Sequence, residues 1–379
     1  MTGKNSSGKE ISVLKYIDEY RNPELVKAII TEIDREFSTE TIQLMEVCGG
    51  HTITIYRYGI HKLLPTNLHL ISGPGCPVCV TGVQYIDQAI AIARQENVII
   101  ASFGDMIRVP GSSSSLQKEK GAGADIRVCY SPMDAVRIAE KNPEKEVVFL
   151  GIGFETTAPT VAAAVESAFE HKIENFSVLS AHKTMPQAMK ALLDSGDVDL
   201  QGFICPGHVS AITGTHIYDF IARDYHIPCV VSGFEPVDML QTILMILRQI
   251  NSNRADVENQ YSRSVRESGN PKALELMWEI FEEADAEWRG LGIIPGSGLN
   301  IREKYHDFDA KIKFSVDVPP ARECAGCICR DIMRGVKVPT DCKLFKIVCN
   351  PQDPKGSCMV SSEGTCATWF KYVENELNP

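Results

Sequence analysis

The chain has 379 residues, a length typical of two or three domains, with 44% hydrophobic and 23% charged residues as in ordinary globular proteins. Its formal net charge of −11 argues against a nucleic-acid-binding protein, which needs clustered lysine and arginine. No apolar run approaches the ~18 residues of a membrane helix, and the polar stretch 1–10 predicts no secretory signal, so we expect a cytoplasmic protein with no membrane or nucleic-acid partner.

Between about residues 20 and 250, strand-like and helical segments alternate. Short apolar runs predict strands at 42–47, 68–72, 98–103, 126–130, 147–152, 176–180, 202–205 and 229–232. Amphipathic patterns predict helices at 24–37, 83–95, 132–141, 157–170 and 186–193. Such alternation indicates an α/β fold built from parallel sheets with crossover helices. The polar segment 251–270 reads as a surface excursion, and a further helix is expected at 273–288.

We expect two parallel-sheet α/β domains, at residues 1–140 and 141–290, and a loop-rich third domain at 291–379. In this last region Gly, Pro and Cys dominate and the periodicity fades. A region of that composition is typically held together by a cofactor rather than by a large core.

Thirteen cysteines are many for a protein without a secretory signal, so metal ligation or thiol redox chemistry is a better explanation than a disulfide framework. Seven of them lie in the last sixth of the chain, at Cys324, Cys327, Cys329, Cys342, Cys349, Cys358 and Cys366. Four converging thiolates predict an iron–sulfur cluster, with a four-cysteine zinc site as the main alternative. A pair of the remaining thiols could form a disulfide beside the cluster. The cluster, which transfers one electron at a time, could then reduce this disulfide, which takes up two. Cys129, Cys205 and Cys229 adjoin strands and are expected to be buried hydrophobes.

Two motifs near the front of the chain also follow predicted strands. Cys48 and His51 lie three residues apart in a Gly-rich turn, where they could share a metal ion, or where the His could lower the thiol pKa. Cys76 and Cys79 form a Cys-x-x-Cys pair at an expected helix start, the arrangement of dithiol oxidoreductases, with half of a zinc site as the alternative.

Two further loops carry candidate catalytic residues. Gly151-Ile-Gly-Phe-Glu155-Thr-Thr begins like a dinucleotide fingerprint, but Thr156 stands where the third glycine belongs, so an anion- or partner-binding loop is expected. His208 follows the strand at 202–205 and could face the same cleft, although an ordinary hydrogen-bonded histidine explains it equally well.

Taken together, six motifs resemble the HypD family of [NiFe]-hydrogenase maturation proteins along almost the whole chain. They are MEVCGGHT at 45–52, GPGCPVC at 73–79, GFETTAP at 153–159, AHKTMP at 181–186, PGHVS at 206–210 and CMVSSEGTC at 358–366. The resemblance implies a scaffold that works with the small partner HypC. The pair would hold an iron ion while it gains two cyanides and one carbon monoxide, cyanide arriving from HypE as a protein-bound thiocyanate. The Fe(CN)2CO group would then pass to the hydrogenase large subunit.

The same resemblance implies roles for individual residues. Cys48 would hold the iron together with a HypC cysteine, with His51 close by, and Cys76 and Cys79 would be a thiol redox couple. A [4Fe-4S] cluster, in surroundings similar to those of ferredoxin:thioredoxin reductase, would have a nearby Cys329–Cys358 disulfide and the ligands Cys327, Cys342, Cys349 and Cys366.

The chain also departs from the family pattern. Ile53 stands where many members have a second histidine, and Cys324 is an addition that leaves the ligand choice among Cys324, Cys327 and Cys329 open.

Our hypothesis is an electron relay from the cluster through Cys329 and Cys358 to Cys76 and Cys79, and then to the iron site at Cys48. One alternative is a stand-alone disulfide reductase that uses the same groups without a partner. The other is a zinc-stabilised binding protein without redox activity.

Overall fold

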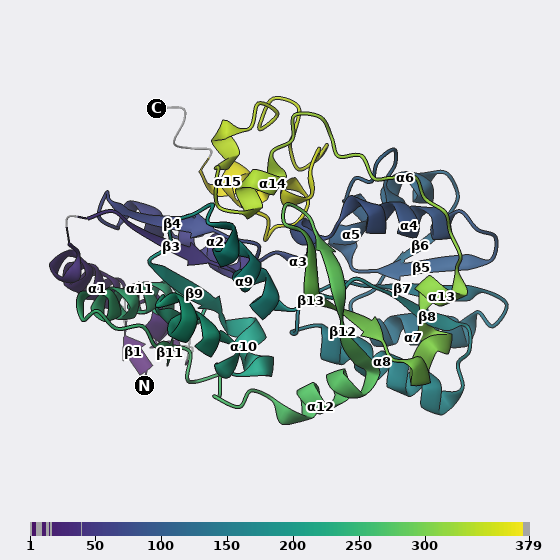
Figure 1. Ribbon diagram of the computed structural model, residues 1–379, viewed down its shortest axis with the longest axis horizontal. Helices are drawn as coiled ribbons and strands as arrows, with labels where there is room; N and C mark the ends of the chain where they lie inside the picture. The colour runs from purple at the N-terminus through teal and green to yellow at the C-terminus, as the bar shows by residue number, and fades with distance from the viewer. Residues whose placement is uncertain (1, 5–9, 13–14, 16, 39, 374–379) are drawn as a thin grey trace.

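The computed structural model describes residues 2–4, 10–12, 15, 17–38 and 40–373, so most of the polar stretch 1–10 lies outside the described part. Two parallel sheets lie side by side, with the C-terminal segment covering the junction between them (Figure 1). One sheet has the order β11-β10-β9-β3-β4 and consists of β3 (Ile42–Glu46), β4 (Leu68–Ser72), β9 (Gly202–Pro206), β10 (Cys229–Ser232) and β11 (Val257–Asn259). The other has the order β6-β5-β7-β8 and consists of β5 (Val98–Ser102), β6 (Asp125–Val128), β7 (Glu146–Gly151) and β8 (Phe176–Ser180). Every strand pair within these two sheets is parallel, which confirms the predicted α/β class.

The helices that cross between strands are α1 (Pro23–Glu36), α2 (Gly49–Arg57), α3 (Pro77–Val80), α4 (Val83–Ala93), α5 (Gly104–Arg108), α6 (Leu116–Gly121), α7 (Pro132–Lys141), α8 (Ala158–His171), α9 (Met185–Ser195), α10 (Gly207–Thr213) and α11 (Pro236–Asn251). Their starts follow from local sequence. Asn22 caps α1 by accepting a hydrogen bond from the backbone of Glu24, and Ser131 and Asp134 form a capping box on α7. Shorter 3-10 turns lie at Asp18–Arg21, Ile60–Lys62 and His216–Tyr218, with a π-helical turn at Ile221–Tyr225. A short antiparallel pair of strands, β1 (Thr2–Lys4) and β2 (Glu10–Ser12), comes before all of these elements in the chain.

The sheets divide the chain differently from the expected boundary near residue 140. Strands β5 and β6 pair with β7 and β8, whereas β9 and β10 return to lie beside β3. The four-stranded sheet, residues 98–180, is therefore inserted between the two halves of the five-stranded sheet. Local periodicity locates strands but does not select their partners, which is why the linear division at 1–140 and 141–290 does not match the topology.

The helix expected at 273–288 is half right. The structure has α12 (Pro271–Ile280), followed by an antiparallel hairpin of β12 (Phe281–Trp288) and β13 (Gly292–Ile301). The Glu- and Ala-rich composition of β12 favours a helix locally, but its pairing with β13 and the burial of Phe281 and Trp288 override that preference. Figure 1 shows this hairpin between the two sheets.

The polar segment 251–270 is also only partly an excursion, because it contributes the edge strand β11. After the hairpin come a 3-10 segment, Glu303–Phe308, and the short helix α13 (Ala310–Lys313). The region from 314 to 373 is loop-rich, as expected, with α14 (Cys329–Met333), α15 (Thr365–Tyr372) and 3-10 turns at Pro339–Asp341 and Ser357–Met359.

The largest buried cluster runs without a break from the sheets into the cysteine-rich segment. It joins Val47 and Val78, beside the front motifs, to Ile332 and five buried cysteines of the C-terminal region. Cys129, Cys205 and Cys229 are also buried, as predicted, at 3%, 0% and 0% exposure. None of the helices in the described part has the length and apolar character needed to cross a bilayer.

Candidate functional site

The loops that carry the two front motifs meet at the carboxyl ends of β3 and β4. These strands are neighbours, and their last residues, Glu46 and Ser72, lie opposite each other. The backbone N–H of Gly49 donates to the carbonyl of Gly75 at 3.2 Å. A Cβ on Gly75 would collide with the backbone of Cys48, so only glycine permits this approach. The structure thus brings Cys48 and the Cys-x-x-Cys loop together.

Cys48 begins α2 as its N-cap residue and is only 8% exposed. Its backbone N–H donates to the carboxylate of Glu46 at 2.9 Å. Burial raises the pKa of the Cys48 thiol to about 12, and the negative charges of Glu363 and Glu46 act in the same direction. Burial also raises the pKa of Glu46 to about 8. Without a nearby cation, this thiol therefore holds its proton.

His51, His208 and Phe234 form a stack beside Cys48. The ring of Phe234 lies 4.9 Å from that of His51 and 3.9 Å from that of His208, centroid to centroid. Burial lowers the pKa of His51 to about 4, so its ring is neutral. Its Nε2 lies 3.3 Å from the carbonyl of Ser232 and carries the hydrogen, because a carbonyl only accepts. Nδ1 is then a buried acceptor without a partner among the described residues.

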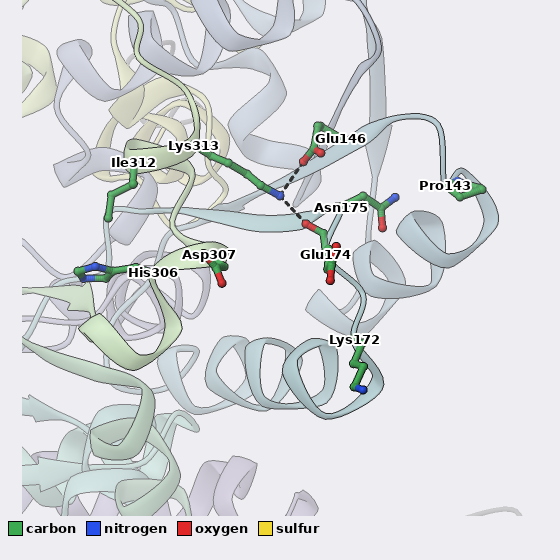
Figure 2. A pocket seen from close by; sticks show the side chains of 9 residues that line it. All are labelled: Pro143, Glu146, Lys172, Glu174, Asn175, His306, Asp307, Ile312 and Lys313. Atoms are coloured by element: carbon green, nitrogen blue, oxygen red, sulfur yellow. Dashed lines mark hydrogen bonds and ion pairs between the residues drawn. The ribbon is translucent and has the colours of Figure 1, made fainter.

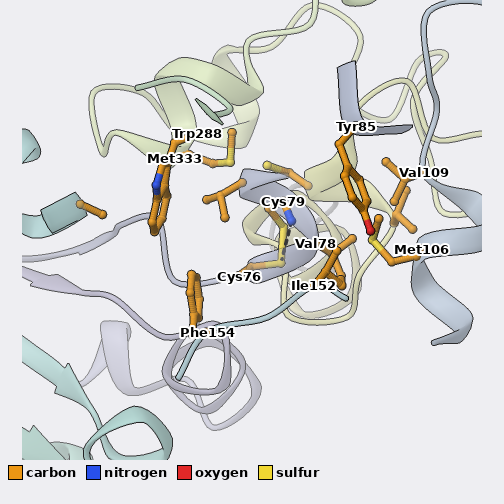
Figure 3. Close-up of a cluster of buried hydrophobic side chains, with 14 of the residues drawn as sticks. Cys76, Val78, Cys79, Tyr85, Met106, Val109, Ile152, Phe154, Trp288 and Met333 are labelled. Atoms are coloured by element: carbon orange, nitrogen blue, oxygen red, sulfur yellow. Dashed lines mark hydrogen bonds between the residues drawn. A yellow bond between two sulfur atoms is a disulfide. The ribbon is translucent and has the colours of Figure 1, made fainter. Parts of the chain in front are cut away.

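Cys76 and Cys79 form a disulfide at the start of α3. The N–H of Cys79 donates to the Cys76 sulfur at 3.3 Å. Figure 3 shows this disulfide surrounded by apolar side chains, among them Val78, Ile152 and Phe154. The backbone of Cys79 also accepts a hydrogen bond from the hydroxyl of Ser357 at 2.8 Å. Because Ser357 directly precedes Cys358, the Cys76–Cys79 disulfide lies against the C-terminal cysteines.

The C-terminal cysteines gather around Cys329. Its sulfur lies 3.3 Å from that of Cys327, and it shares hydrogen bonds with Cys358 and Cys366. Those hydrogen bonds lower the pKa of Cys358, and Cys349 lies within electrostatic range of Cys327 and Cys329.

Two other members of this group stand apart. Cys342 is buried nearby, with its sulfur 3.9 Å from the carbonyl of Gly326, whereas Cys324 is exposed. Cys329 and Cys358 are both free thiols, so the disulfide that the resemblance implied between them is not formed in the structure.

We tested whether these residues fit an iron–sulfur cluster. Within the described ranges, no three His, Cys, Asp or Glu side chains are arranged at metal-binding distances. The donor set nevertheless suits a cluster, because the sulfurs of Cys327, Cys329, Cys358 and Cys366 lie close together and Cys342 and Cys349 are also buried in this region. The chain is also shaped around these sulfurs: a Cβ on Gly356 would collide with the sulfurs of Cys327 and Cys329. The chemistry of the donor set therefore agrees with the expected group.

Glu155 lies in the loop after β7, where its Oε1 accepts a hydrogen bond of 2.9 Å from the backbone N–H of Met185. Its Oε2 is buried and has no partner among the described residues. Burial raises the pKa of Glu155 to about 7. Phe154, one residue earlier, stacks on Trp288 with 5.8 Å between the ring centroids. This contact joins the loop after β7 to the β12–β13 hairpin, beside the disulfide.

Sequence reasoning missed three residues of this site: Glu46, Phe234 and Glu363. Glu46 is the last residue of β3, and Phe234 follows β10, so both stand at strand ends where functional residues are expected. Glu363 lies in the Ser-Ser-Glu-Gly turn and packs against Gly49, a contact with no local sequence signal.

A separate surface pocket, drawn in Figure 2, contains none of the predicted site residues. Lys313 lies in it and donates to the carboxylate of Glu146 at 2.8 Å. Its lining includes Glu146 and Asn175, at the amino ends of β7 and β8, so it faces away from the strand ends that carry the motifs.

Comparisons with known proteins agree with the motifs. The HypD family model, described as "Hydrogenase formation hypA family", matches residues 24–373. The hydrogenase maturation factor HypD2 of Bradyrhizobium diazoefficiens is 48% identical over 371 residues, which cover 95% of this chain and 97% of the relative. HypD of Rhodobacter capsulatus is 47% identical over 95% of this chain and 98% of its own length. HypD of Escherichia coli (strain K12) is 42% identical over 96% of this chain and 99% of its own length.

Proposed function

Because the chain belongs to the HypD family of hydrogenase maturation factors, we propose that it is the scaffold on which the Fe(CN)2CO group of a [NiFe]-hydrogenase is assembled. In this proposal it holds iron together with HypC, accepts cyanide from HypE and serves the hydrogenase large subunit indirectly. The observation that carries the proposal is the contact between the Cys48 loop and the Cys76–Cys79 loop, under the C-terminal cysteines. The abundance of free thiols favours a reducing compartment, so the proposed site of action is the cytoplasm.

The iron substrate would bind at Cys48. A divalent cation there replaces the thiol proton and compensates the carboxylates of Glu46 and Glu363, whose charges otherwise oppose ionisation. Thiolate sulfur also suits low-spin iron that carries cyanide and carbon monoxide. The unpartnered Nδ1 of His51 gives the site a neutral acceptor nearby.

The dithiol form of Cys76 and Cys79 would release cyanide from the thiocyanate. The S–C bond of a protein-bound R–S–C≡N accepts two electrons and breaks into R–S⁻ and cyanide. The two thiols supply these electrons, lose two protons and form the disulfide in which they are found here. Apolar side chains around the pair exclude water from this exchange.

A [4Fe-4S] cluster in the C-terminal site would supply single electrons that return this disulfide to the dithiol. The resemblance assigns its ligands to Cys327, Cys342, Cys349 and Cys366. Cys329 and Cys358 lie among the C-terminal sulfurs, and Ser357 lies against Cys79, which supports a path from these thiols to the disulfide.

The proposal is tested by anaerobic co-purification with HypC, followed by infrared spectroscopy of the cyanide and carbon monoxide stretches. We expect the Cys48→Ala variant to lose these bands and the Cys76→Ala variant to lose cyanide delivery from HypE. Cys129→Ala, which removes a buried thiol remote from the site, is the matched control and should keep both. Unchanged cyanide delivery in Cys76→Ala would refute the relay.

The disulfide beside the cysteine group also favours a second candidate, a disulfide reductase that needs no partner. That protein would reduce small disulfides catalytically without HypC and would show no cyanide or carbon monoxide bands. A colourless protein with stoichiometric zinc would instead indicate the zinc-stabilised binding protein.

A further inference from the structure

A buried arginine, Arg289, follows β12 and has no role in the function proposed above. Only 5% of its surface is exposed. Its backbone N–H donates to the carbonyl of Val80 at 2.9 Å, and its Nε donates to the carbonyl of Thr81 at 3.1 Å. Arg289 is therefore fastened to the end of α3, the helix that carries the Cys76–Cys79 disulfide.

The positive charge of Arg289 has no carboxylate partner among the described residues. Its buried Nη2 also has no hydrogen-bond partner in that part of the chain. Glu287, the nearest acidic residue in sequence, has its carboxylate against Gly82 instead. A buried, unbalanced guanidinium is strongly destabilising, so an anion is expected next to it.

The C-terminal cysteines are the groups that can provide this anion. The guanidinium lies within electrostatic range of the sulfurs of Cys327 and Cys358. The next residue, Gly290, packs against Arg330, since a Cβ there would lie 3.1 Å from the Arg330 Cα, and Arg330 follows Cys329 directly. Arg289 is thus held to the end of α3 by its Nε, while the residue that follows it packs against the segment that carries Cys329.

We propose that Arg289 is a positioning residue whose positive charge stabilises the anionic sulfur of the C-terminal site and raises its reduction potential. This inference rests on the proposed [4Fe-4S] cluster. Four thiolates give such a site a net negative charge, and reduction adds one more electron. A fixed cation beside the sulfurs therefore favours the reduced state, and it does so next to the disulfide that must receive electrons.

The test is a potentiometric titration of the anaerobic holoprotein, followed by electron paramagnetic resonance and visible absorbance. Arg289→Gln removes the charge but keeps a donor for Thr81, whereas Arg289→Lys keeps the charge. We expect Arg289→Gln to disfavour reduction at least tenfold, a downward shift of about 59 mV for a one-electron couple. Arg289→Lys should stay close to the wild-type potential.

The matched control is Arg302→Met, at the other end of the same hairpin, where the guanidinium also donates to backbone carbonyls. It should leave the potential unchanged. An Arg289→Gln protein with the wild-type potential would overturn the proposal. If Arg289→Gln cannot hold a cluster, retention in Arg289→Lys supports the charge, and loss in both variants overturns it. A wild-type protein without a cluster would instead refute the proposed function itself.

Discussion

The two sheets and the C-terminal segment at 314–373 are held together by different means. The sheets have paired parallel strands of 3 to 6 residues and an aliphatic and aromatic core in which Phe149, Phe176 and Phe203 are 0% exposed. The C-terminal segment has only short helices, and five of its buried residues are cysteines. Hydrophobic burial therefore accounts for the stability of the sheets, whereas we expect the C-terminal segment to depend also on the group proposed to bind its sulfurs.

This difference matters because the proposed electron path crosses from one region to the other. Its crossing point is the hydrogen bond between Ser357 and the backbone of Cys79. Cys79 lies in α3, close after β4, whereas Ser357 belongs to the C-terminal segment. A change at Ser357 should therefore alter electron transfer more than it alters the proposed iron site at Cys48. Variants in each region can separate these effects.

The largest expected effect is the loss of the metal site. Cys366→Ala removes one implied ligand, and we expect the bound iron–sulfur to be largely lost because a [4Fe-4S] cluster is ordinarily held by four thiolates. Region 314–373 should then become open to proteolysis while the sheets stay protected, as limited proteolysis with mass spectrometry would detect. Cys129→Ala, in a buried position remote from the cluster, is the control. Full iron content in Cys366→Ala would contradict the assignment.

A core substitution in a sheet should have the opposite result: it should lower the stability of the protein and leave its iron content unchanged. Phe149→Ala empties a fully buried position in β7 and should lower the free energy of unfolding by about 3–5 kcal/mol. Iron per folded molecule should not change, because Phe149 lies in a different core cluster from the C-terminal cysteines. Denaturant titration and iron analysis together check this, and a parallel loss of iron would mean that the two regions are not independent.

The sequence predicted the sheets and their motif-bearing loops because parallel strands carry a strong local signal. The runs at 68–72, 176–180 and 229–232 match β4, β8 and β10 residue for residue. A strand followed by Gly and a functional residue also locates a loop at the carboxyl edge, which is how Cys48 and Cys76 were found.

The remainder depends on contacts between distant segments. Nothing local indicates that β9 returns to lie beside β3, or that the acidic run before Trp288 pairs as a strand. For the same reason the stack on Phe234 and the buried charge of Arg289 were not predicted. Each exists only because residues more than 150 positions apart in sequence, or on different sheets, are brought together.

Gly75→Ala should weaken the contact that joins the two front motifs. The added methyl group would collide with the backbone of Val47 and Cys48, which cannot rotate away, so we expect a cost of about 3 kcal/mol. The Cys48-dependent infrared bands should weaken as the loops separate. Gly121→Ala, where a Cβ meets nothing within 4 Å, is the control. A Gly75→Ala protein with normal stability would show that the loops are not in fixed contact.

The last expected effect depends on pH and concerns Glu155, in the loop after β7 of the other sheet. Its pKa is raised by burial from 4.5 to about 7, so the folded state keeps a proton that the unfolded chain releases. The contribution of Glu155 to stability should therefore fall as the pH rises from about 4.5 to 7 and level off above that, by about 3 kcal/mol. Glu155→Gln imitates the protonated side chain and should make this slope shallower, leaving the part that Glu46 contributes through its own raised pKa. Glu170→Gln, on the exposed face of α8, should keep the wild-type slope. Denaturant titrations at pH 4.5, 6 and 8 measure the slope, and identical slopes in wild type and Glu155→Gln would mean that the Glu155 carboxyl is charged in the folded protein.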